Sequence, residues 1–446
     1  MAKGFLQKAG RDFKTTYAPV ASMTSVKSLI AIAATLGLTI FGSDVTGAFL
    51  QSMLDDLLYL EFDGVVYLLY KTLYGLRQAA ASWNEDLDRE MRRMGLMPSA
   101  DDHCIYTRCT DDGWLLIVVW VDDFVGAASN DAIRDEFLSD FKYEFGSISK
   151  QLDWVLKIRV EYSGSVIALN QAVYIEGVAA KFGVIDANKK YTPMESDASI
   201  YTKDQMPEIG SEEWCEMRNV PYRELLGCLL YAAEIRGDIA FAVNKLSRFA
   251  SNPAQVHWKA LKRVLIYLYT TRNRRLVFGD SASVDFDNPI AVFMDADHAG
   301  CKDTARSTSG VVIKLFGNTV FTKAKRQGKV ANSTGAAELH AMADAVRRIT
   351  PYRGVIEDMG FYQRTVPFYS DSQVAIDMIK RGHLASATKH LRISYYTVLE
   401  AVQAGDIALH HVPGEENVAD ILTKSLPRDT HNKHADSLLR DKAIGV

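Results

Sequence analysis

Apolar and polar positions follow two different periods along the chain, which predicts a mixed α/β protein. Apolar side chains three to four positions apart predict helices, whereas short apolar runs and alternation predict strands. Up to residue 182 the helix period covers residues 25–37, 79–96 and 172–182, and the strand pattern covers residues 38–45, 115–128 and 154–171. Two further helical stretches follow at residues 222–250 and 255–271.

The last part of the chain predicts a compact α/β unit of its own. From about Val284 the order is strand, strand, helix, strand, helix, strand and helix, over about 160 residues, which is enough to fold alone. The polar stretch at residues 192–214 carries Pro, Ser, Gly and acids with no period, so we expect a linker there.

Length and composition narrow the class of protein. At 446 residues the chain is too long for one core, so two or three domains are expected. Its 48% hydrophobic and 24% charged residues are typical of globular proteins and argue against a largely disordered chain. No apolar run reaches the roughly 18 residues of a membrane span, and the first ten residues lack the apolar core of a signal peptide. Five cysteines, an odd number, favour reduced thiols and an intracellular setting.

The net charge of −4 hides one strongly basic segment. Residues 241–280 contain eight Lys or Arg and a single acid, Asp280. Such a segment attracts polyanions even when the whole chain is slightly acidic. A solvated helix face is the alternative that the segment alone leaves open.

A pair of acids interrupts an apolar run in "LLIVVWVDDFVGAA". Asp122 and Asp123 could form a type I turn between two strands, because Asp is a good turn former. A third acid, Asp44, follows the apolar strand "LTIFGS" and can point from a strand end into a cleft. Three carboxylates from two neighbouring strand ends can hold two magnesium ions for phosphoryl transfer.

Four acids in the carboxy-terminal unit repeat this chemical logic. Asp295 and Asp371 end predicted strands, and Glu338 and Asp420 lie on predicted helices. Each taken singly fits a surface acid, but their shared placement in one α/β unit favours a metal site. Asp297 is a rival for Asp295, because it lies two residues on and faces the same side of a strand.

Five motifs follow one another along the chain: "DVTGAFL", "LYGLRQAAASW", "VWVDDF", "PYRELLGCLLY" and "HWKALKRVLIYL". In this order they resemble the reverse transcriptase of copia-type LTR retrotransposons. The later motifs "FMDADHAG", "STSG", "YSDSQVAI", "TKH" (residues 388–390) and "ENVADILTK" resemble the ribonuclease H domain of the same polyprotein. The resemblance covers nearly the whole chain. It implies polymerase fingers and palm over residues 1–198, a basic helical thumb and connection over 199–283, and a ribonuclease H-like α/β domain over 284–446.

The resemblance also implies roles for individual residues. It assigns two magnesium ions to each of two acid groups, Asp44, Asp122 and Asp123 in the palm, and Asp295, Glu338, Asp371 and Asp420 in the nuclease. Phe49 matches the position that screens the sugar of the incoming nucleotide, and Tyr74, Gly75 and Gln78 match the motif against template and nucleotide. The cations expected to contact the nucleic-acid backbone are Lys245, Arg248, Lys259, Lys262 and Arg263.

The implied activity is that of an RNA-directed DNA polymerase, a nucleotidyltransferase, joined to a ribonuclease H that cleaves RNA–DNA hybrids. Its partners would be an RNA template, a DNA primer or hybrid and deoxynucleoside triphosphates, with integrase and protease segments in a parent polyprotein and no membrane. The expected setting is intracellular, in a cytoplasmic virus-like particle or the nucleus.

Some departures from the family pattern favour a second hypothesis. The family has a basic fingers segment upstream of "AKGF", so we expect an amino-terminally truncated polymerase, and Ala80 and Ala81 replace the usual Pro and Arg. The alternative is therefore a truncated or degenerate remnant that binds nucleic acid or keeps only the nuclease.

Overall fold

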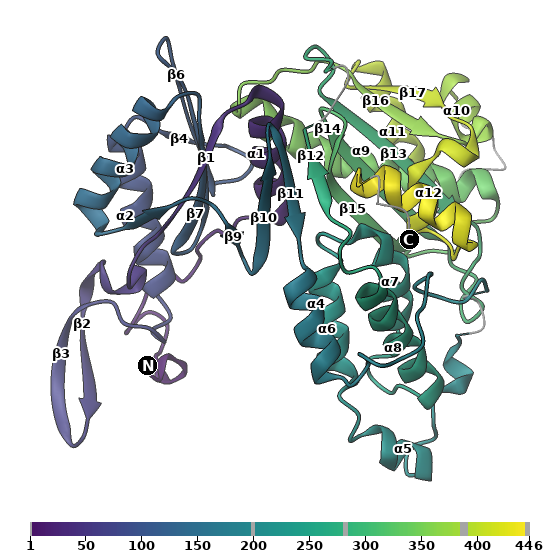
Figure 1. The fold of residues 1–446 in the computed structure, drawn as a ribbon, viewed down its shortest axis with the longest axis horizontal. Helices are drawn as coiled ribbons and strands as arrows, with labels where there is room; N and C mark the ends of the chain where they lie inside the picture. The colour runs from purple at the N-terminus through teal and green to yellow at the C-terminus, as the bar shows by residue number, and fades with distance from the viewer. Residues whose placement is uncertain (1, 198–200, 280–283, 384–390, 442–446) are drawn as a thin grey trace. The chain divides into compact units, whose positions relative to one another are not determined.

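The computed structural model describes residues 2–197, 201–279, 284–383 and 391–441 (Figure 1). The "TKH" motif, with Lys389 and His390, lies outside the described residues. The chain forms two compact units, residues 1–152 with 351–361, and residues 153–350 with 362–446. Helices and strands occur in both units, which confirms the mixed α/β class. The three domain boundaries expected from the sequence stay predictions.

Unit 1 is built on an antiparallel sheet with strand order β4-β5-β6-β7-β1-β8. Its strands are β1 (Thr39–Asp44), β4 (Met97–Pro98), β5 (Ile105–Thr110), β6 (Gly113–Trp120), β7 (Asp123–Ala128) and β8 (Ile148–Lys150). The central strands β6 and β7 are almost wholly buried, which is why their sequence reads as a continuous apolar run.

Helices cover this sheet. They are α1 (Met23–Leu36), α2 (Ala79–Arg93) and α3 (Asp131–Phe145). Figure 1 shows α2 and α3 on one side of the sheet and α1 on the other. Phe41, Leu87 and Phe137 belong to the core that β1 shares with α2 and α3. The end of the long helix α9 also belongs to this unit, where Tyr352 and Ser28 share a buried hydrogen bond of 2.8 Å.

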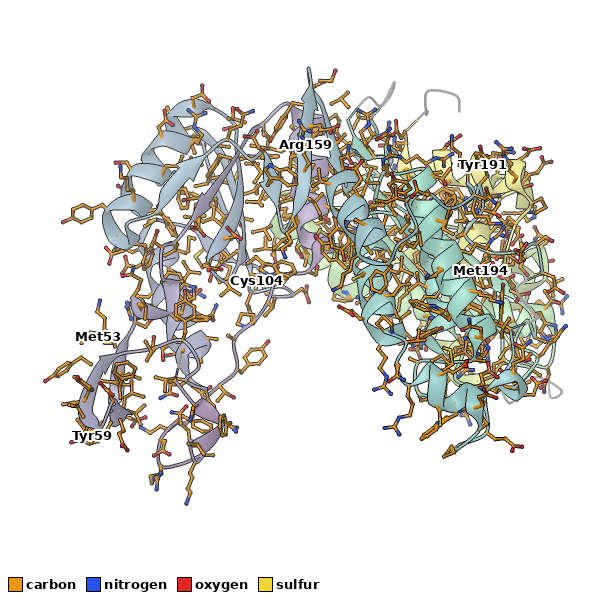
Figure 2. All side chains as sticks on the ribbon, turned by 60° about the horizontal axis from the view of Figure 1, so that its bottom comes forward. Met53, Tyr59, Cys104, Arg159, Tyr191 and Met194 are labelled. Carbon is orange, nitrogen blue, oxygen red and sulfur yellow. The ribbon has the colours of Figure 1, made fainter. Side chains whose placement is uncertain are left out.

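A two-stranded hairpin of unit 1 stays largely outside the core. It consists of β2 (Met53–Phe62) and β3 (Val65–Lys71) and follows the short helix η2 (Ala48–Leu50). Met53 and Tyr59, both labelled in Figure 2, are 60% and 67% exposed, whereas Leu58 is buried. Hydrophobic burial therefore contributes little to holding this hairpin.

The first half of unit 2 joins a small antiparallel sheet to a helical layer. The sheet has the order β12-β11-β10-β9, and its strands are β9 (Trp154–Val155), β10 (Ile158–Ser163), β11 (Val166–Asn170) and β12 (Leu276–Phe278). The helices are α4 (Ala172–Lys181), α5 (Glu212–Met217), α6 (Tyr222–Ala232), α7 (Ala240–Ser247) and α8 (Gln255–Thr270). Met194 and Tyr201 are buried in the core of this layer, so the stretch predicted as a linker is in part a packed segment.

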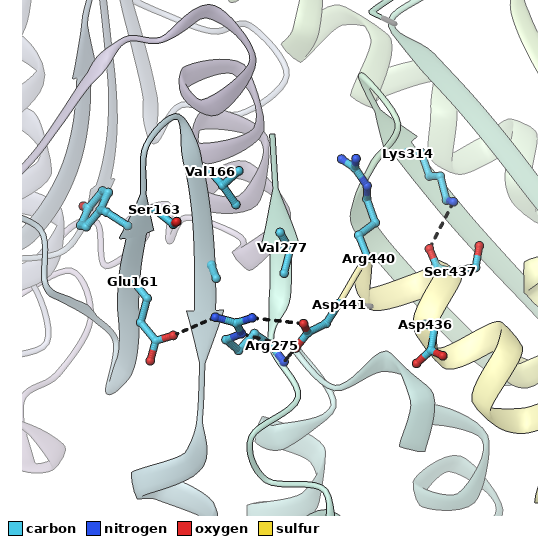
Figure 3. Close-up of a pocket in the computed structure, with 12 residues that line it drawn as sticks. Glu161, Ser163, Val166, Arg275, Val277, Lys314, Asp436, Ser437, Arg440 and Asp441 are labelled. Atoms are coloured by element: carbon cyan, nitrogen blue, oxygen red, sulfur yellow. Dashed lines mark hydrogen bonds and ion pairs between the residues drawn. The ribbon is translucent and has the colours of Figure 1, made fainter. Parts of the chain in front are cut away.

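Arg275 ties this small sheet to the end of the chain. It pairs with Glu161 of β10 at 3.6 Å and with Asp441 at 3.2 Å, beside a cavity of about 640 Å³ (Figure 3). Asp441 follows the last helix, α12 (Arg428–Leu439). The small sheet and the carboxy-terminal domain are therefore parts of one packed unit.

The second half of unit 2 is a five-stranded sheet with the order β15-β14-β13-β16-β17. Strands β13, β16 and β17 are parallel, and β14 and β15 are antiparallel to their neighbours. The strands are β13 (Ile290–Asp297), β14 (Thr308–Leu315), β15 (Asn318–Arg326), β16 (Val366–Ser370) and β17 (Ile407–His411). The helices are α9 (Thr334–Asp358), α10 (Gln373–Lys380), α11 (Arg392–Gln403), α12 and the short 3-10 helix η8 (Val418–Leu422). No helix among the described residues is long and apolar enough to cross a membrane.

Candidate active sites

The three acids of unit 1 meet at one end of the central sheet. Asp44 ends β1 and Asp123 begins β7, and the two residues are direct partners in the antiparallel ladder. Asp122 lies in the turn between β6 and β7, and its carbonyl oxygen accepts a hydrogen bond of 2.9 Å from the N–H of Val45. The backbone thus holds all three acids at neighbouring positions.

The turn that carries Asp122 exists, but it is not of type I. Val121 has a φ of 60°, whereas both central residues of a type I turn have negative φ. A β-branched residue in this region costs on the order of 1–3 kcal/mol. The indole Nε1 of Trp83 donates a 2.7 Å hydrogen bond to the carbonyl of Val121, which helps to hold the strained turn in place.

The side chains of this group differ in their exposure to solvent. Asp44 and Asp122 are half-buried and Asp123 is exposed. Among the described residues, the three acids whose ligand atoms all lie within 4.8 Å of one another are in unit 2, not here. The backbone of unit 1 therefore gathers these acids without closing their carboxylates into a cage.

The residues matched to nucleotide and template lie close to one another in the fold. The rings of Phe49 and Tyr74 are 5.1 Å apart, and the Thr72 hydroxyl donates to the carbonyl of Phe49. Gly75 has a φ of 99°, a conformation that other residues rarely adopt. Gln78 is buried and donates a 3.1 Å hydrogen bond to the carbonyl of Asp12, so its amide holds the amino-terminal segment.

In unit 2, two parallel strands bring their acids to the same level. Val292 of β13 is paired with Phe368 of β16, so Asp295 and Asp371, three residues further on, lie side by side. Asp420 comes from η8, and the ligand atoms of the three acids all lie within 4.8 Å of one another. Asp297, the rival candidate, is not one of this group.

A glycine allows η8 to reach the strands. Gly310 of β14 is the ladder partner of Asp295, and a Cβ at Gly310 would lie 2.8 Å from the carbonyl oxygen of Ala419. A larger residue would push η8, and with it Asp420, away from the sheet. Asn417 fixes the start of the same turn by donating 2.9 Å to the carbonyl of Met294.

Glu338 completes the acidic surroundings from α9. It is 3% exposed, and its Oε2 has no hydrogen-bond partner among the described residues. Burial, together with the charges of Asp295 and Asp371, raises the pKa of Glu338 to about 9. Burial and the neighbouring Asp420 raise the pKa of Asp295 to about 7, and the pKa of Asp371 is raised for the same reasons. The raised pKa values of Asp295, Glu338 and Asp371 suit a site that binds added positive charge.

Three residues beside these acids were not predicted as site residues. The Thr423 hydroxyl donates to Asp295, Lys424 pairs with Asp420 at 2.9 Å, and Gly310 makes room for η8. The i,i+4 spacing of Asp420 and Lys424 was the one signal for them in the sequence. Glu338 Oε2 and Asp420 Oδ1 are buried and unpaired, and such hard oxygen ligands fit magnesium.

The predicted backbone cations fall into two groups. Lys245 of α7 and Arg248, which directly follows this helix, are directed into unit 2, where Lys245 is 3% exposed and Arg248 donates to the Thr308 hydroxyl at 3.4 Å. Burial lowers the pKa of both side chains. On α8, Lys259 is exposed, and Lys262 lies over the Trp258 ring at 5.4 Å. Arg263 is paired with Glu195.

Known proteins match this chain over most of its length. Residues 1–196 match the family model described as reverse transcriptase (RNA-dependent DNA polymerase). The retrovirus-related Pol polyprotein from transposon TNT 1-94 of Nicotiana tabacum is 32% identical over 445 residues, 96% of this chain and 33% of that protein. The chain thus spans about a third of the length of the curated relatives it matches.

Solved structures give weaker likenesses. The foamy viral protease-reverse transcriptase in complex with RNA/DNA hybrid is 12% identical, with a TM-score of 0.49, and covers 92% of this chain and 48% of that chain. RNase H1 from the archaeon Halobacterium salinarum NRC-1 is 19% identical, with a TM-score of 0.24. This match covers 30% of this chain and 93% of that chain. The likeness to known proteins therefore rests on the sequence relatives. Residues 1–196 match a reverse transcriptase domain, and over 96% of its length the chain is similar to a retrotransposon Pol polyprotein, which confirms the resemblance seen in the sequence.

Proposed function

We propose that the chain is an RNA-directed DNA polymerase with ribonuclease H activity, and that each activity uses two magnesium ions. The observation that carries the proposal is the group formed by Asp295, Asp371 and Asp420, with buried Glu338 beside it. These four acids would hold the ions of the nuclease. When bound, the ions would activate a water for attack on the RNA strand and stabilise the leaving oxygen.

The residues around these acids have supporting tasks. The Thr423 hydroxyl orients Asp295, and Lys424 holds one oxygen of Asp420. Burial excludes water from Asp295 and Glu338, so their charge interacts strongly with a cation. The chain would thereby offer a dry, oriented set of oxygens at the edge of the sheet where a nucleic-acid strand can approach.

For the polymerase, Asp44, Asp122 and Asp123 would hold the ions, and Phe49 and Tyr74 would face the nucleotide. The ladder pairing of Asp44 with Asp123 and the bonds that fix the hairpin turn support this role. The substrates would be an RNA template, a DNA primer or hybrid, and deoxynucleoside triphosphates. Lys259 and Lys262 would contact the backbone. The chain would work inside the cell, in the particle or nuclear setting implied by the resemblance.

A second candidate function is a nuclease without an effective polymerase. The carboxylates of unit 1 favour it, because two ions need closely spaced oxygens and, among the described residues, the group of three acids with such spacing lies in unit 2.

Two assays on the full chain separate the candidates. Primer extension on an RNA template measures the polymerase, and cleavage of a labelled RNA–DNA hybrid measures the nuclease. The main proposal expects magnesium-dependent activity in both, with extension lost in Asp123→Asn and cleavage lost in Asp371→Asn. Cleavage without extension would support the second candidate, and absence of both in a folded protein would contradict both.

A further inference from the structure

A basic groove lies on the carboxy-terminal sheet, apart from the cations that the sequence pointed to. It has a volume of about 180 Å³ and lies between β14, β15 and α9. Buried Ser309 and Val311 of β14 line it. Its cations are Lys323 and Lys325 of β15 and Arg347 and Arg348 of α9.

The positive charge of this groove is only partly compensated. Asp344 is the one acid that lines it, and Asp344 is already paired with Arg347. The Arg348 guanidinium lies 4.8 Å from the centre of the Phe321 ring. Burial, Arg348 and Lys325 all lower the pKa of Lys323, as expected where cations crowd together. The groove therefore favours an anion.

Size and polarity point to a phosphate group as that anion. The groove is smaller than the roughly 300–1,000 Å³ of a small-molecule pocket, so it suits a phosphate better than a whole nucleotide. The Ser309 hydroxyl accepts a hydrogen bond of 2.9 Å from Gln327, so a neutral group lines the groove beside the cations. Side-chain contacts to phosphate oxygens carry no sequence information, which suits a backbone contact.

The fold links this groove to the acids of the nuclease site. Ser309 is the ladder partner of Ala296, the residue that follows Asp295. Glu338 and Arg347 lie nine residues apart on α9, which corresponds to about 14 Å along the helix. A nucleic-acid strand advances about 3.4 Å per nucleotide, so a strand that ran along α9 would cover this distance in about four nucleotides.

We propose that this groove is a binding site for a backbone phosphate of an RNA–DNA hybrid, about four nucleotides from the acids of the nuclease site. The site would hold the hybrid in register without contacting the reacting phosphate. The spacing between the groove and the acids has a meaning only if the proposed nuclease function is right, whereas phosphate binding in the groove does not depend on that function. Hybrid affinity is therefore the primary readout.

The test measures binding of a fluorescent RNA–DNA hybrid by the full chain, with Asp371→Asn as the common background to prevent cleavage. Replacing Lys323→Gln and Arg347→Gln together should raise the Kd about fivefold or more near 0.1 M salt. It should also reduce the slope of log K against log salt by about one, the expectation for one lost phosphate contact. The reversal Lys325→Glu should weaken binding further, and equal melting temperatures would show that the variants are folded.

A charge-matched control removes two exposed cations elsewhere in unit 2, Lys181→Gln and Arg218→Gln. This variant should keep the affinity and the salt slope. Equal losses in the control and the groove variants, or no loss in either, would overturn the proposal. Melting shifts with inorganic phosphate that vanish in the groove variants, with hybrid binding unchanged, would assign the groove to a free anion and also overturn it. If instead the proposed nuclease function is wrong, the groove variants would still weaken hybrid binding, but the chain without any substitution would not cleave the hybrid.

Discussion

The two acid groups of this molecule are built in opposite ways. In unit 1 the acids sit on a hairpin and a strand end, and their side chains face solvent to different degrees. In unit 2 the acids come from two parallel strands, a helix and a 3-10 turn, and Asp295, Glu338 and Asp420 are buried. In the second group burial raises the pKa values of Asp295, Glu338 and Asp371, whereas in the first Asp44 and Asp122 are only half-buried and Asp123 is exposed. On the proposed function, the contrast predicts that the acids of unit 2 are gathered before ligands bind and that those of unit 1 close only with them.

The largest expected effect separates the two groups by substitution. Asp371→Asn should lower hybrid cleavage roughly 10²- to 10³-fold and leave primer extension unchanged, because it removes a negative charge and one carboxylate oxygen from the proposed nuclease site alone. Asp123→Asn should do the reverse. The exposed Asp429→Asn serves as a control that changes neither rate. A loss of both activities in either variant would show that the sites are not independent.

The second effect tests whether packing forms the nuclease site. Gly310→Ala places a Cβ 2.8 Å from the Ala419 carbonyl and 2.9 Å from Leu422, and should destabilise unit 2 by about 1–3 kcal/mol and displace Asp420. Cleavage should therefore fall while extension is kept. Gly328→Ala meets no atom within 4 Å and should be nearly neutral in both the urea-unfolding and cleavage measurements.

A third effect concerns pH in the absence of metal. The folded pKa values of Asp295 and Glu338, about 7 and about 9, exceed their unfolded values near 4, so the folded state binds more protons between these limits. The melting temperature in EDTA should therefore fall as the pH rises from 5 to 8, and magnesium should restore more of it at pH 8. Asp295→Asn should flatten this slope and Asp123→Asn should not. A melting temperature that rises with pH in EDTA would contradict the buried-acid description.

The smallest effect concerns the turn between β6 and β7 in unit 1. Trp83→Phe removes the hydrogen bond to the Val121 carbonyl, which is worth about 0.5–1.5 kcal/mol. Primer extension should drop several-fold, with hybrid cleavage unchanged, because the turn that carries Asp122 loses one of its supports. Primer extension at the normal rate in this variant would show that Trp83 does not position the turn.

Local patterns predicted the elements that carry the acids. Local sequence determines the apolar runs around Asp44 and Asp122 and the alternation of helices and strands after residue 284. These elements could therefore be predicted from the sequence. The structure corrects details that the local pattern hides. The apolar stretch at 310–323 is two strands, because Phe316 and Gly317 turn with positive φ, and Asp420 lies on a 3-10 turn rather than an α-helix.

Other features depend on contacts between distant segments. The helix α11 did not emerge from the pattern, since Ile393 and Tyr396 are exposed and blur its apolar face. Met194 and Tyr201 look like loop residues until the helices of unit 2 pack around them. The inward direction of Lys245 is set by packing in the same unit, which a count of basic residues cannot show.

Metal binding without nucleic acid tests the central contrast most directly. We predict that the full chain binds Mn²⁺ in solution, that Asp295→Asn with Asp371→Asn abolishes this binding, and that Asp44→Asn with Asp123→Asn leaves it unchanged. Binding that depends on the palm acids instead, or that survives both double substitutions, would contradict a nuclease site formed in advance and a palm site that is not.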